Sequence, residues 1–243
     1  MQEKQSVTHL EILQHAICYL ISFGGLYGFY IIFTCIFALF PSFTSWNDGI
    51  QNTILTTIAY GFTFISLGIY LYNIALKDII KQYTKIKNVL TGILYGFGLI
   101  AGSIIVSLVV SNIAALLGVS IESNENQQSI EASALSMPVL TALMTVIFAP
   151  VTEELGYRFG IFGGIHKYNR YAAYIVTSII FALIHFNLNN NIVNELLNLP
   201  TYIFAGFWLC FAYEKSGSIV TSITAHMTNN LVSLIITLKS ASL

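Results

Sequence analysis

The sequence predicts an all-α polytopic membrane protein, a bundle of about seven transmembrane helices with its N-terminus in the cytoplasm. Of the 243 residues, 56% are hydrophobic and only 9% are charged. Soluble domains carry about 25% charged residues, so this chain has too few charges to cover a water-facing surface. The mean hydropathy of +0.74 agrees with this. We therefore expect most of the surface to contact lipid.

Apolar stretches of membrane-spanning length divide the chain. A helix needs about 20 apolar residues to cross the hydrocarbon core. The first stretch is longer than a signal-peptide core and has no small-residue cleavage site, so we expect it to be retained as a helix. The sixth predicted span, residues 199–213, is the shortest. The predicted spans cover residues 12–40, 50–76, 88–119, 137–162, 171–188, 199–213 and 217–238.

Positive charges fall on alternate sides of these spans. The connections without Lys or Arg are residues 41–49, 120–136 and 189–198. The other connections carry Lys77, Lys81, Lys85, Lys87, Lys167, Arg170 and Lys215. Since basic loops stay in the cytoplasm, this pattern places the N-terminus inside and leaves Lys239 as one exception outside. The acidic segment 122–131 is expected to be an exposed external loop.

The remaining composition excludes several classes of protein. The net charge is −1 and the basic residues form no patch, so nucleic acid is not an expected partner. Cys18, Cys35 and Cys210 lie in apolar stretches without CxxC spacing, which is typical of packing residues. We expect a multi-pass plasma-membrane protein, and the Ile- and Asn-rich composition suggests a bacterial source.

The fourth span carries charges that lipid disfavours. A charged side chain at mid-membrane costs about 2.5–3.5 kcal/mol, so it normally faces the protein interior and has a function. Adjacent Glu153 and Glu154 point about 100° apart on a helix. Glu154 and Arg158 are one turn apart and can pair, which leaves Glu153 available for chemistry. A purely structural ion network is disfavoured, because burying two carboxylates against one arginine is costly.

Two histidines and an asparagine lie in later spans. His185 ends the fifth span, and taken alone it would be interpreted as a packing residue. His226 and Asn230 are one turn apart on the seventh span and share a face. Both can donate hydrogen bonds to an oxyanion, or else between helices. The span limits place Glu153 and His185 at depths that differ by roughly 10 Å.

These residue types suit two chemistries. In the first, Glu153 and His185 activate a water, with no cofactor required. His226 and Asn230 then stabilise the oxyanion of a tetrahedral intermediate. In the second, Glu153, His185 and His226 bind Zn²⁺ and leave one position for an activated water. No HExxH motif brings two histidines together locally, and the residue types leave both chemistries open.

Three ordered motifs resemble those of the CPBP family, also called the Abi or CAAX-protease-like family of intramembrane peptidases. EELGYR at 153–158 resembles the family's EExxxR, FALIH at 181–185 its FxxxH, and HMTNN at 226–230 its HxxxN. The resemblance covers residues 137–238. The first three spans match only as generic hydrophobic helices.

The resemblance implies a polytopic helical peptidase, whose eukaryotic relatives remove the last three residues of prenylated CaaX proteins. It implies that Glu153 is the general base with His185, and that the HxxxN motif forms the oxyanion hole. It further implies that Glu154 and Arg158 support the site. The family is commonly labelled a metalloprotease family, although a metal-free glutamate mechanism has also been argued. Many bacterial relatives are linked to bacteriocin immunity or peptide maturation.

We therefore expect two regions, residues 1–136 with the N-terminal transmembrane helices and external polar loop, and residues 137–243 with the catalytic core. The expected function is that of an intramembrane endopeptidase acting on a membrane-associated protein or peptide. The alternative is a non-catalytic immunity or sensor protein that binds a bacteriocin-like peptide or a partner membrane protein. A transporter is disfavoured because no clear inverted repeat is present.

Overall fold

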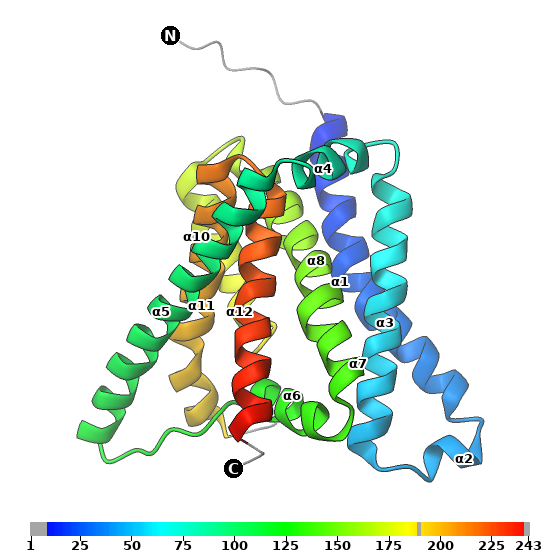
Figure 1. Cartoon of the computed structure of the whole chain (residues 1–243), viewed down its shortest axis with the longest axis vertical. Coiled ribbons are helices and arrows are strands. Elements are labelled where there is room, and N and C mark those ends of the chain that lie inside the picture. Colours follow the sequence, from blue (N-terminus) through cyan, green and yellow to red (C-terminus); the bar gives the residue numbers. More distant parts are fainter. Residues whose placement is uncertain (1–8, 189–190, 241–243) are drawn as a thin grey trace.

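The computed structural model of the chain describes residues 9–188 and 191–240, and the regular structure in these ranges is helical throughout (Figure 1). The elements, with π-helical segments written η, are α1 (His9–Phe37), α2 (Pro41–Thr44), α3 (Asp48–Leu71), α4 (Leu76–Tyr83), α5 (Ile86–Leu116), α6 (Glu125–Ser136), α7 (Pro138–Ala142), η1 (Leu143–Phe148), α8 (Ala149–Glu154), η2 (Leu155–Phe162), α9 (Gly163–His166), α10 (Arg170–Leu183), α11 (Ile192–Ser216) and α12 (Ile219–Ser240).

Within the described residues, six helical stretches are long and apolar enough to cross a membrane. They are α1, α3, α5, the continuous run Pro138–His166, α11 and α12. The predicted polytopic all-α architecture is confirmed. The fifth predicted span is the short one, since α10 has only 14 residues.

The sixth predicted span is longer than expected, because α11 has 25 residues. The polar stretch before residue 199 was predicted to be a connection. Asn191 instead caps a helix there, and its side chain accepts hydrogen bonds from the backbone N–H groups of Val193 and Asn194. A side-chain cap of this kind satisfies donors that the first turn would otherwise leave unpaired, so the helix starts earlier.

The two ends of the bundle differ in charge. Figure 1 places α4 at one end and α2 and α6 at the other, with the last turn of α12 near α6. The α4 end carries Lys77 and Lys81, and the α9–α10 and α11–α12 connections reach the same end. The structure thus gathers at one end the basic residues that the sequence assigns to the cytoplasm.

Residues 125–131 are helical, which corrects the prediction of an external loop. They belong to α6, which packs against α3 and α12. Asn124 is 2% exposed, and its side chain accepts a hydrogen bond from the Gln127 N–H group. It also donates to the backbone carbonyl of His185 at 3.2 Å. The sequence did not predict this helix, because α6 is held by hydrogen bonds to the bundle and not by an apolar face.

Close helix packing brings α5 against α12. A Cβ atom on Gly92 would lie 2.5 Å from Cβ of Thr224, and one on Gly96 would lie 2.6 Å from Cβ of Thr228. Only glycine leaves room for such an approach, as in other membrane helix pairs. The α5–α12 contact holds α12 in place, and α12 carries the HxxxN motif.

Candidate active site

The two adjacent glutamates lie at the end of α8, between the π-helical segments η1 and η2. Such segments are rare and are frequently found at functional sites. Glu154 is fully buried, and Oε1 lies 2.9 Å from Nη1 of Arg158 and 2.9 Å from Nδ1 of His226. Its other oxygen accepts a hydrogen bond from Ser222. Glu154 thus connects α8, η2 and α12.

Arg158 completes this buried network. Its side chain is fully buried, and Nη2 donates to the backbone carbonyl of Gly206 in α11 at 3.3 Å. The guanidinium lies 4.6 Å from the ring centroid of Phe181, a cation–π contact. The predicted pairing of Glu154 with Arg158 is present. Because each charge has an opposite charge beside it, the pair can be held away from water.

Glu153 has a different environment. Its Oε1 atom accepts a hydrogen bond from the Tyr60 hydroxyl at 3.0 Å. The other carboxylate oxygen, Oε2, is buried and has no hydrogen-bond partner within the described residues. A buried oxygen of this kind requires water or a polar ligand. Glu153 therefore has one carboxylate oxygen that no described protein group binds.

His185 lies on the turn that follows α10. Its Nδ1 atom is 2.8 Å from the backbone carbonyl of Phe181, and its ring stacks on Tyr202 with centroids 4.5 Å apart. A carbonyl only accepts hydrogen bonds, so Nδ1 carries the hydrogen. In the neutral ring, Nε2 is then the nitrogen with a free lone pair.

His226 and Asn230 lie one turn apart on α12. The contact of His226 Nδ1 with Glu154 assigns the Nδ1 hydrogen to that bond, since a carboxylate accepts. The Asn230 side chain donates to the backbone carbonyl of Thr145 in η1 at 2.8 Å, and its oxygen accepts from Asn229 at 3.1 Å. One N–H of the Asn230 amide and Nε2 of His226 have no part in these bonds.

One cavity of about 260 Å³ is lined by Glu153, His185, His226 and Asn230 together. We call it the catalytic cavity. Glu154 and Arg158 are not among its lining residues. Three segments that are distant in the sequence therefore meet at one space.

The expected difference in depth between Glu153 and His185 is wrong, since both line this cavity. The 14-residue α10 ends before His185, and the run that holds Glu153 extends to His166. At 1.5 Å per residue, each side chain lies roughly 20 Å from the basic end of its own helix. The predicted spans began and ended at other residues, and this produced the apparent mismatch.

A second cavity of about 160 Å³ adjoins the first, and Glu153 and His185 line both. Ser22 on α1 and Tyr157 on η2 also line it, and neither hydroxyl has a partner within the described residues. Buried polar groups without protein partners are commonly satisfied by water. This space is therefore suited to hold water beside Glu153.

The predicted zinc ligands do not form a ligand set here. In residues 9–188 and 191–240, no three His, Cys, Asp or Glu side chains are placed so that they could hold a metal ion. The side chains as placed therefore do not fit Zn²⁺.

Sequence reasoning missed the partners that other helices contribute. Tyr60 from α3 binds Glu153, and Ser222 binds Glu154. One signal was available, because the buried positions of α3 include Thr53, Thr57 and Thr63. A polar face inside an apolar span indicates that the span faces a polar interior.

The comparisons with known proteins agree with the motifs. Residues 135–232 match the model of the family described as Type II CAAX prenyl endopeptidase Rce1-like. A protein of Mycoplasma capricolum is 25% identical over 207 residues, 81% of this chain and 58% of its own length. The UPF0177 protein YvdC of Lactococcus lactis is 28% identical over 76% of this chain and 68% of its own length.

A third relative, named "Putative membrane peptidase YdiL", from Bacillus subtilis, is 29% identical over 51% of this chain and 47% of its own length. The matched part thus covers less than two thirds of the Mycoplasma and Bacillus relatives. No solved structure matches the chain. Residues 135–232 of this multi-pass membrane protein are thus similar to the Rce1-like (CPBP) family.

Proposed function

We propose that this protein is an intramembrane endopeptidase that hydrolyses a peptide bond of a membrane-associated protein or peptide. The observation that carries the proposal is the catalytic cavity. There, Glu153, whose Oε2 atom has no hydrogen-bond partner within the described residues, lines the same space as two imidazoles and an amide. These are the groups that activation of water and stabilisation of an oxyanion require.

In the proposed mechanism, a water lies between Oε2 of Glu153 and Nε2 of His185. Glu153 takes one proton as the water oxygen attacks the carbonyl carbon of the scissile bond. The carbonyl oxygen becomes an oxyanion. Collapse of the tetrahedral intermediate breaks the C–N bond, and the proton held by Glu153 goes to the leaving nitrogen. The products are a new carboxylic acid and a new amine, and transfer of the acid proton to the amine leaves a carboxylate and an ammonium group.

His226 and Asn230 would donate to the oxyanion from His226 Nε2 and the second N–H of Asn230. Because Nδ1 of His226 already donates to Glu154, donation from Nε2 requires the doubly protonated ring. Glu154 supplies the negative charge that pairs with that form. Arg158 and Ser222 keep Glu154 in place. Glu154 and Arg158 would therefore act through His226 rather than on the substrate.

The zinc alternative would use Glu153, His185 and His226 as ligands, and the metal would supply a Lewis acid and an activated water. The arrangement of these side chains does not favour it, so no step above depends on a metal. The matched family is named after a CAAX prenyl endopeptidase, an enzyme that acts on prenylated proteins.

The test compares membrane-associated peptides in cells that make the normal protein, Glu153→Gln or the control Asp78→Asn. Asp78 is an exposed carboxylate on α4, outside the cavities described above. Mass spectrometry should find cleavage products with the normal protein and Asp78→Asn, and none with Glu153→Gln at equal membrane level. Equal products with Glu153→Gln would contradict hydrolysis and would favour a binding or immunity role.

A further inference from the structure

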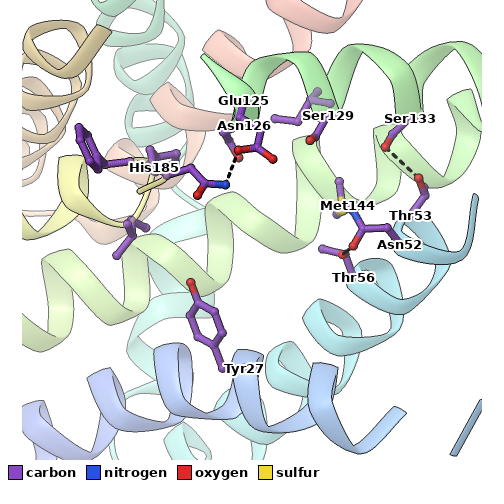
Figure 2. Close-up of a pocket in the computed structure, with 14 residues that line it drawn as sticks. Tyr27, Asn52, Thr53, Thr56, Glu125, Asn126, Ser129, Ser133, Met144 and His185 are labelled. Atoms are coloured by element: carbon purple, nitrogen blue, oxygen red, sulfur yellow. Dashed lines mark hydrogen bonds between the residues drawn. The ribbon is translucent and has the colours of Figure 1, made fainter. Parts of the chain in front are cut away.

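A third cavity, of about 450 Å³, lies at the α6 end of the bundle (Figure 2). We call it the antechamber and define it by Tyr27 on α1, Asn52, Thr53 and Thr56 on α3, and Asn126 and Ser129 on α6. It adjoins the catalytic cavity, because Thr56, Asn126 and His185 line both. The two cavities are therefore neighbours, and Glu153 lines the second of them.

The lining of the antechamber is polar and nearly without charge. Hydroxyl and amide groups from three helices point into it in Figure 2. Among its described lining residues there is no Lys or Arg, and the single carboxylate, Glu125, accepts a hydrogen bond from Asn187. Such groups can donate to and accept from an extended peptide backbone. A polar cavity of this size in a membrane protein needs water or a polar guest.

The antechamber lies at the end of the bundle opposite to the basic α4 end. The cytoplasmic end, by the distribution of Lys and Arg, is the α4 end (Figure 1). The acidic residues of the opposite end are Asp48, Glu122, Glu125, Glu131 and Glu195. The antechamber end is therefore extracytoplasmic and carries negative charge, with Lys239 as the basic residue at the end of α12.

Buried apolar side chains occupy the other direction. Between Glu154 and the α4 end, a cluster of buried side chains joins α3, α4, η2 and α12. Its members include Leu67, Leu71, Ile79, Leu155, Ile219, Val220 and Ile223. Each is at most 8% exposed. A polar peptide segment cannot pass through such a cluster without losing its hydrogen bonds to water.

We infer that the substrate reaches Glu153 from the extracytoplasmic side through the antechamber. The segment of substrate held there is an uncharged or cationic polar stretch of peptide, next to the membrane-embedded part. Acidic segments are disfavoured by the carboxylates at this end. This inference names the side and the substrate class of the proposed peptidase, and so rests on the proposed function.

Cysteine accessibility tests the inference without any need for catalysis. Cys35 is the exposed native cysteine, and Cys18 and Cys210 are fully buried. In a Cys35→Ala background, three matched single changes are made. Thr44→Cys reports the α2 end, Thr84→Cys the α4 end and Thr56→Cys the space shared by the antechamber and the catalytic cavity.

Intact cells are treated with membrane-impermeant methanethiosulfonates, one with a quaternary ammonium and one with a sulfonate. The thiolate displaces methanesulfinate and forms a mixed disulfide. We expect labelling of Thr44→Cys and Thr56→Cys in intact cells, and of Thr84→Cys only after permeabilisation. Relative to a free thiol in solution, Thr56→Cys should favour the cationic reagent by about threefold or more.

Labelling of Thr56→Cys only after permeabilisation, or not at all, would overturn the extracytoplasmic route. Labelling of Thr84→Cys in intact cells, with Thr44→Cys labelled only after permeabilisation, would also overturn it. If the two reagents label Thr56→Cys at equal rates, each relative to its rate with a free thiol in solution, the charge preference is overturned. Because labelling does not require hydrolysis, these outcomes are separate from a failure of the Glu153→Gln comparison, which concerns the proposed function itself.

Discussion

The Tyr60 hydroxyl donates to Oε1 of Glu153 at 3.0 Å and thereby joins α3 to α8. The bond occupies one carboxylate oxygen and leaves Oε2 without a protein partner among the described residues. Tyr60 lies outside residues 135–232, which match the family model. The N-terminal helices therefore contribute directly to the geometry of the proposed general base.

Tyr60→Phe removes this hydrogen bond and keeps the ring. We expect kcat to fall about tenfold with little change in KM, since a hydrogen bond to a charged group is worth about 1.5 kcal/mol or more. Steady-state kinetics, with the exposed Tyr72→Phe as control, measure both parameters. An unchanged kcat, or a change in KM alone, would contradict this role.

Glu154→Gln should destabilise the fold, whereas Glu153→Gln should not. Loss of Glu154 leaves the fully buried Arg158 without its counter-charge, a change that costs about 3–5 kcal/mol in comparable buried pairs. Glu153 has a neutral partner, Tyr60, so its neutral isostere leaves no charge uncompensated. Thermal unfolding of the detergent-purified variants measures the difference. Equal unfolding midpoints for the two variants would argue against Arg158 depending on Glu154.

Asn230→Ala should lower kcat by about 100-fold or more, the usual effect of removing one oxyanion donor. The matched change Asn112→Ala removes an exposed amide that bonds only within α5 and should leave kcat unchanged. Single-turnover kinetics separate the chemical step from binding. A loss of binding without any loss in the chemical step would place Asn230 outside the oxyanion hole.

Activity should not require stoichiometric zinc if Glu153 is the base. Purified protein should retain full activity after chelation, with less than one zinc per chain by metal analysis. His185→Ala and His226→Ala should lose activity without a change in metal content. A chelator-sensitive activity, restored by zinc and accompanied by zinc loss in both variants, would support the metal alternative instead.

Local spacing predicted part of the site correctly. The Glu154–Arg158 pair follows from one helical turn, and the shared face of His226 and Asn230 follows from the same geometry. Tyr60 could not be assigned, because its contact depends on how α3 packs against α8. The helix α6 was also missed, since its partners lie about 60–80 residues away in sequence and are polar.

The limits of the spans were the least predictable part of the fold. Hydropathy located the apolar runs, but it could not show that α10 ends before His185 or that α11 starts at Ile192. The start of α11 depends on the side-chain cap from Asn191, and a cap extends a helix into polar sequence. These two limits determine the depth of His185, and with it the meeting of His185 and Glu153 in one cavity.

The most direct measurement uses purified normal protein and Glu153→Gln, reconstituted in lipid vesicles with the peptide identified by the comparison in cells. The account predicts that Glu153→Gln lowers the hydrolysis rate by about 10²–10⁴-fold, the range for loss of a general base, with an unchanged unfolding midpoint. A rate within about twofold of normal, which is under 0.5 kcal/mol in the barrier, would contradict the assignment of Glu153 as the base.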